Sequence, residues 1–213
     1  MAWGGVQYAL IGLAPYSFHY DLSKSNSLQF LMLRYCIAFE DLHNFFMPTE
    51  VYKKFLRADY FDIKVPLESF DVNNPFLAKT PLRFMTHQNY LGARKSVEGW
   101  NDKNFPETRA ENIKIFDDYL ILCAENKIRP IMFLPTVTEC YKKYFNRQML
   151  DEFYYLVAQA CKKHSAAIFI DGWKLQGLTD ADFYDVSHLN IQGAAKFSMF
   201  LNQCIEQIDA QGG

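Results

Sequence analysis

The chain has 213 residues, of which half are apolar and 22% are charged. This length supports one α/β or α+β domain with a substantial core, and two full domains are not expected. The formal net charge of −2 shows no excess of basic residues that would attract nucleic acid or an anionic membrane surface, so neither is predicted as a partner. No apolar run approaches the roughly 20 residues that a membrane-spanning helix requires.

Three short apolar runs have the length and the bounding residues of buried parallel strands. They are VQYALIGLA (6–14), IRPIMFLPT (128–136) and AAIFIDGW (166–173). Helical periodicity precedes the second run in residues 107–127 and the third in residues 149–164. A last helix is expected to begin near Asn190, whose side chain can cap free backbone amides.

The middle of the chain, residues 51–103, is rich in Asn, Pro and Gly in its second half. Such a composition favours turns over helices and strands. We therefore predict an insertion or cap with little regular structure inside a single domain that spans residues 1–213.

The alternation of strand and helix predicts an α/β fold, in which a parallel sheet carries helices on both faces. In such sheets ligands bind beyond the carboxyl ends of the strands. The loops that follow the three strands, residues 15–21, 135–141 and 171–188, are therefore expected to meet on one rim.

Asp185 and His188 place an acid and a base three positions apart on the last of these loops. In a tight turn the carboxylate can hold one ring nitrogen of the histidine and leave the other facing a ligand, which is the arrangement of a serine hydrolase. The alternative is a structural role, with the aspartate as a helix cap and the histidine bonded to backbone.

The segment D-V-S-H-L-N-I-Q-G-A, residues 185–194, resembles the last block of the SGNH (GDSL-like) hydrolase superfamily. YALIGLAPYSFHYDLSKS (8–25) and residues 105–145 look like the membrane-associated branch similar to the D-alanyl transfer proteins of teichoic acid modification. The resemblance covers about half of the chain. It implies a three-layer, flavodoxin-like fold, a triad completed by Asp185 and His188, and an acylated carbohydrate or a small ester as substrate.

The resemblance also implies a nucleophilic serine in a G-D-S or G-N-S block, and this chain contains neither block. If the first strand here corresponds to the family's third, the serine and two strands would precede Met1. The chain would then be the C-terminal part of the domain, and its exposed sheet edge would favour self-association.

Ser17 is the candidate nucleophile inside the chain, because it follows the first strand. The alternative is a loop serine bonded to local backbone, since the glycine-flanked turn that exposes a catalytic serine is missing. Ser187 is too close to His188 in sequence for the usual attack geometry.

Three further residues are candidates for substrate contact: His19, Tyr141 and Asn190. His19 shares one face of an extended segment with Asp21, although a hydrogen-bonded loop histidine is an equal alternative. The ring of Tyr141 could stack on a sugar or belong to the core.

No metal or other cofactor is predicted. The five histidines lack the spacing of a ligand set, and the five cysteines have no C-x-x-C pair, so reduced thiols are expected. Such cysteines favour a reducing compartment, whereas the family resemblance suggests a membrane-associated or extracytoplasmic bacterial protein.

Two functions remain open. The first is an SGNH-like ester hydrolase or O-acyltransferase acting on acyl esters, with Asp185 and His188 serving a serine supplied from outside this chain. The second is a non-catalytic domain of the same fold that lost its nucleophile and binds a glycan or a protein.

Overall fold

The computed structural model describes residues 5–21, 87–101 and 105–212. Nearly all of them belong to one compact unit formed by residues 1–20 and 82–213. The helices and strands of this unit are β1 (Tyr8–Gly12), α4 (His87–Asn101), α5 (Pro106–Glu125), β2 (Arg129–Leu134), α6 (Glu139–Tyr144), α7 (Arg147–Lys163), β3 (Ile168–Asp171), the 3₁₀ turns η5 (Gly172–Lys174) and η6 (Asp180–Asp182), and α8 (Ile191–Gly212).

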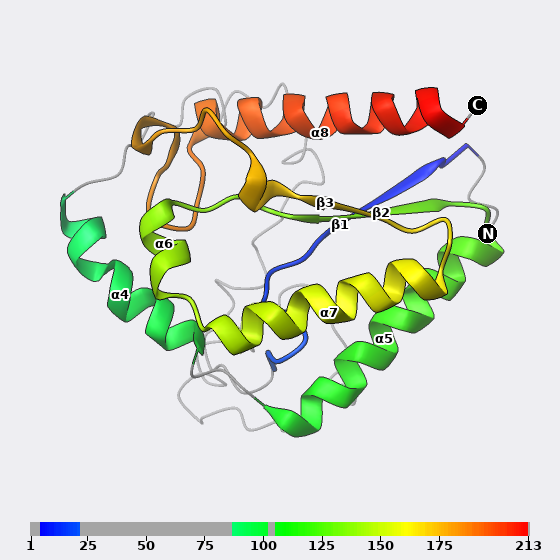
Figure 1. Cartoon of the computed structure of the whole chain (residues 1–213), viewed down its shortest axis with the longest axis horizontal. Helices are drawn as coiled ribbons and strands as arrows, with labels where there is room; N and C mark the ends of the chain where they lie inside the picture. The colour runs from blue at the N-terminus through cyan, green and yellow to red at the C-terminus, as the bar shows by residue number, and fades with distance from the viewer. Residues whose placement is uncertain (1–4, 22–86, 102–104, 213) are drawn as a thin grey trace, which may run out of the picture. The chain divides into compact units, whose positions relative to one another are not determined.

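The three strands form one open parallel sheet in the order β1-β2-β3. Tyr8 is aligned with Arg129 across the first pair, and Ile131 with Ile168 across the second. Figure 1 shows α8 on one face of this sheet and α5 and α7 on the other. The predicted strands, the helices between them and the α/β class are thereby confirmed.

β2 lies at the centre of the sheet and is covered on both faces. Ile131, Met132 and Leu134 are at most 1% exposed, as expected for a continuous apolar run between two helical layers. Phe153 of α7 packs into the core on one side. On the other side the ring centroid of Phe197 in α8 lies 6.0 Å from the ring centroid of Phe133.

The prediction of little regular structure is wrong for residues 87–101, which form the helix α4. Ala93 and Val97, four positions apart, are fully buried in a cluster with residues of α6 and α7. Gly92 and Gly99 lie on the exposed side, and the roughly 1 kcal/mol that each costs a helix is outweighed by this packing. The rest of the predicted insertion, residues 51–86 and 102–103, lies outside the described residues.

Within the described ranges, Cys123, Cys140, Cys161 and Cys204 are free thiols, as predicted. In the same ranges no helix is both long and apolar enough to cross a membrane. Cys36 lies outside them.

Gly193, in the first turn of α8, is required by a close backbone approach. A Cβ atom there would lie 2.0 Å from the carbonyl oxygen of Asp182 and 2.9 Å from Leu189 Cδ2. We expect Gly193→Ala to lower the free energy of unfolding by about 2 to 3 kcal/mol, because the backbone of the preceding loop must shift.

Urea denaturation measures this loss. Gly99→Ala is the matched control, since a Cβ atom at this position would have nothing within 4 Å, and this variant should be neutral or more stable by up to about 1 kcal/mol. Equal effects of the two substitutions would contradict the close approach.

Candidate functional site

The loops that follow the three strands meet, as predicted, at the carboxyl ends of the strands. The backbone N–H and the side-chain hydroxyl of Thr138 both donate to the carbonyl oxygen of Val186, at 3.2 and 2.8 Å. Tyr16, from the loop after β1, packs against the cluster that contains Tyr141 and Val186. The rim therefore joins segments that are far apart in sequence.

Asp185 and His188 belong to a closed loop before α8. An antiparallel bridge pairs Phe183 with Leu189, and the amide of Tyr184 donates to the carbonyl oxygen of His188 at 2.8 Å. This closure places the acid and the base in one tight turn.

The carboxylate of Asp185 holds the ring of His188 in one orientation. Both carboxylate oxygens lie 2.9 Å from Nδ1, and Oδ1 also accepts the backbone N–H groups of Ser187 (2.8 Å) and His188 (2.9 Å). Because an ionised carboxylate only accepts hydrogen bonds, the ring proton belongs on Nδ1 and the lone pair on Nε2.

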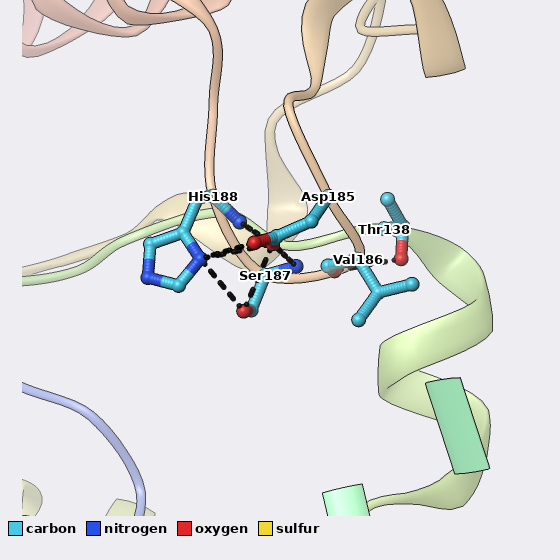
Figure 2. Close-up of polar contacts among 5 residues, drawn as sticks. All are labelled: Thr138, Asp185, Val186, Ser187 and His188. Carbon is cyan, nitrogen blue, oxygen red and sulfur yellow. Dashed lines mark hydrogen bonds and ion pairs between the residues drawn. The ribbon is translucent and has the colours of Figure 1, made fainter. Parts of the chain in front are cut away.

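Nε2 lies on the side of the ring away from Asp185 (Figure 2). It makes no hydrogen bond within the part of the chain that the structure describes, and the His188 side chain is 72% exposed. A basic nitrogen is thus presented at the rim with its partner nitrogen already bonded.

The two groups shift each other's pKa in opposite directions. The hydrogen bond to Asp185 raises the pKa of His188 above its usual value, against the effect of burial. Burial alone would raise the pKa of Asp185, but the hydrogen bonds from His188 and from the amide of Ser187 lower it below its usual value. The pair is therefore electrostatically suited to a histidine that gains a proton during a reaction.

Ser187 contacts the acid side of this pair. Its hydroxyl lies 3.1 Å from His188 Nδ1 and 3.2 Å from Asp185 Oδ1. A nucleophile would have to face Nε2. Ser187 therefore contributes to holding the turn and is not placed to attack a substrate.

No hydrogen bond joins Ser17 to His188 in the structure. The Ser17 hydroxyl accepts the N–H of Ala14 at 2.9 Å, and the Ser17 amide donates back to the carbonyl oxygen of Ala14 at 2.8 Å. These bonds close a turn within the loop. They correspond to the structural alternative for this serine.

His19 and Tyr141 are both buried, at 4% and 3% exposure. His19 Nε2 lies 3.2 Å from a carboxylate oxygen of Glu152 on α7. The ring of Tyr141 stacks on Phe145 with centroids 5.8 Å apart, and burial raises the pKa of its hydroxyl. Both positions fit the structural alternatives, since a buried ring has no face to offer a sugar.

Asn190 caps α8, as predicted. Its Oδ1 accepts the amides of Gln192 and Gly193 at 3.0 Å each, and its Nδ2 donates to the carbonyl oxygen of Ala181 at 2.7 Å. Both ends of the buried side chain are thus bonded to backbone. The geometry gives Asn190 a structural role and no contact surface for a substrate.

Sequence reasoning did not single out Asp182 or Thr138, which hold the loop in place. Asp182 is buried, accepts the amide of Thr179 at 2.8 Å and pairs with Lys196 at 2.6 Å. The T-x-x-D spacing of Thr179 and Asp182 is a capping-box signal that could have identified it. Thr138 is the N-cap of α6, which a threonine before a helix indicates, but its bond to Val186 leaves no local signal because the two residues lie 48 positions apart.

Comparison of the chain with protein-family models and with curated proteins gives no match. Among the described residues, no three His, Cys, Asp or Glu side chains are grouped as a metal site would require. The function must therefore be argued from the geometry of the rim.

We expect Asp185→Asn to lower the pKa of His188, because the substitution removes the negative charge that stabilises the imidazolium form. NMR titration of the histidine ring resonances measures the shift. Asp117→Asn is the matched control, because Asp117 pairs with His164, a second described histidine that is hydrogen-bonded to an aspartate. If the titration midpoint of His188 moved equally in both variants, the pairing of Asp185 with His188 would be contradicted.

We expect Asn190→Ala to lower the free energy of unfolding by about 1 to 2 kcal/mol through loss of the helix cap. Asn202→Ala, at an exposed position of the same helix, should change it by less than about 0.5 kcal/mol. Thermal and urea unfolding measure both variants. An unaltered stability of Asn190→Ala would return Asn190 to the candidates for ligand contact.

Proposed function

We propose that this chain is an SGNH-like domain that hydrolyses or transfers O-acyl esters, with His188 as general base and Asp185 as the group that orients it. The observation that carries the proposal is the Asp185–His188 clamp, which bonds Nδ1 and leaves Nε2 open at the rim. Its substrate class is an acylated carbohydrate or a small ester.

The chemistry follows from this geometry. Nε2 of His188 takes the proton of a serine hydroxyl while the serine oxygen attacks the ester carbonyl, and the resulting imidazolium is stabilised by Asp185. Collapse of the tetrahedral intermediate breaks the ester bond, and His188 returns the proton to the departing alcohol. Water or an acceptor alcohol then attacks the acyl-enzyme by the same proton route.

The position of the Asp185–His188 clamp in the fold supports the proposal independently of the sequence spacing of the two residues. It lies on the loop after the last strand of a parallel sheet, where ligands bind in open α/β folds. The other named residues of the terminal block, Asn190 and Gly193, hold the loop against α8 and keep the clamp in place.

The nucleophile is the missing part of the proposal. No hydrogen bond joins a serine hydroxyl to His188 Nε2 among the described residues, and the proposal therefore takes the nucleophile from outside them. The same observation favours a second candidate function, a non-catalytic domain that uses this rim to bind a glycan or a protein.

Fluorophosphonate labelling, read by peptide mass mapping, distinguishes the two functions. We expect one labelled serine and hydrolysis of p-nitrophenyl acetate. His188→Ala should abolish the labelling and lower kcat/KM by roughly 10⁴-fold or more, and Asp185→Asn should cost less. His164→Ala is the control that should leave the rate unchanged. No labelling of the folded chain would mean that the nucleophile lies outside it or has been lost. Absence of labelling and of His188-dependent hydrolysis also in a protein with the natural upstream sequence restored would decide for the binding domain.

Activity should rise with pH through the pKa of His188, because only the neutral ring accepts a proton. Since Asp185 raises that pKa, the midpoint should lie above about 6.5, the ordinary value for histidine. Asp185→Asn should move the midpoint to lower pH. A pH–rate profile whose midpoint is the same in the two proteins would contradict the assignment of the base.

A further inference from the structure

The outer edge of β1 carries no further strand. Among the described residues, β1 pairs only with β2, and nothing pairs with its other side. The side chain of Leu10, at the middle of the strand, is 55% exposed. We propose that this edge pairs with the same edge of a second copy of the chain, antiparallel and across a twofold axis at Leu10, so that two three-stranded sheets become one.

The backbone of β1 presents hydrogen-bonding groups along this edge. The amide of Arg129 in β2 donates to the carbonyl oxygen of Gln7 at 2.9 Å, so Gln7 faces β2. Because successive residues of a strand direct their backbone groups to alternate sides, the N–H and C=O groups of Tyr8, Leu10 and Gly12 point outward. None of these groups forms a hydrogen bond within the described part of the chain. They give three donors and three acceptors in a row.

The side chains of β1 are complementary to themselves in this arrangement. In an antiparallel pair centred on Leu10, each Leu10 lies opposite the other, and Tyr8 of one copy lies opposite Gly12 of the second. All three side-chain positions share one face of the strand, because side chains alternate between the two faces. The ring of Tyr8 can therefore cover the glycine position of the other copy, a cross-strand pairing of an aromatic residue with an edge glycine that stabilises sheets.

The edge lacks the residues that commonly keep sheet edges apart. The run VQYALIGLA (6–14) contains no charged side chain and no proline. Proteins often protect open edges with Lys or Pro, since an unprotected apolar edge is a template for a further strand. Two copies of this edge bring no like charges together, so their pairing meets no local electrostatic repulsion.

An exposed apolar stripe of α5 extends the same surface. Ile115, Tyr119 and Leu122 are exposed and follow the i, i+4, i+7 spacing of one helix face. Tyr119 and Leu122 line, together with Tyr8 and Ala9 of β1, a recess of about 200 Å³ that joins the stripe to the edge strand. Burial of the stripe and the edge in both copies would remove roughly 1,000 Å² from solvent, near the lower end of specific interfaces. We therefore expect a weak dimer, with a dissociation constant of about 1 to 100 μM.

Sedimentation velocity between about 1 and 300 μM tests this pairing, and the mass should rise from one chain towards two. Leu10→Lys places like charges directly opposite one another and should weaken the dimer at least about tenfold. Tyr155→Lys is the matched control, because Tyr155 on α7 is 62% exposed, and it should leave the dissociation constant unchanged. A chain that stays monomeric throughout, or equal losses in the two variants, would overturn the proposal.

Hydrogen exchange of the β1 amides is a second measurement and requires no variant. The amides of Tyr8, Leu10 and Gly12 should become protected as the concentration rises, whereas those of Ala9 and Ile11, which face β2, should be protected at every concentration.

Protection of Leu10 that does not depend on concentration would mean that another segment of the same chain covers the edge. Lack of protection at the highest concentration would mean that the edge stays open to solvent or to a partner other than a second copy. Either result would overturn the proposal. Neither measurement uses an ester substrate, so failure of the dimer and failure of the proposed function are distinguishable.

Discussion

The buried carboxylate of Asp182 is the interaction on which the candidate site depends. One oxygen pairs with Lys196 of α8, and the other accepts the amide and hydroxyl of Thr179. Although burial alone would raise the pKa of this carboxyl, these partners lower it, so the group remains charged inside the protein. A buried charge is tolerated only when it is paired and hydrogen-bonded in this way.

The backbone of the same residue completes the attachment. The carbonyl oxygen of Asp182 accepts the amide of Asn190, and Gly193 approaches it too closely for any side chain. The loop that carries Asp185 and His188 is thereby held at both ends against α8. On its outer side the loop is tied to the β2 rim through Thr138 and Val186, which Figure 2 shows beside the clamp.

Two histidine–aspartate pairs occur in the described chain, and their surroundings separate them. In the first, Asp117 binds His164 and Lys163 together, and the His164 side chain at the end of α7 is 12% exposed. This pair joins α5 to α7 through a ring that is largely buried. In the second, Asp185 bonds only the inner nitrogen of a ring that is 72% exposed. Burial and the choice of ring nitrogen, more than the presence of an acid beside a base, distinguish a candidate catalytic pair from a structural one.

The sequence by itself determined the three strands, the helices between them, the cap at Asn190 and the turn that pairs Asp185 with His188. Each of these features depends on residues within one apolar run or one helical turn. Residues that are adjacent in sequence are therefore sufficient to predict it. Only the tertiary structure decided that residues 87–101 form a helix, that Tyr141 and His19 are buried, and that Ser17 is bonded within its own loop. These outcomes depend on packing and hydrogen bonds between distant segments, such as Thr138 with Val186. Such contacts cannot be predicted from the local amino-acid composition.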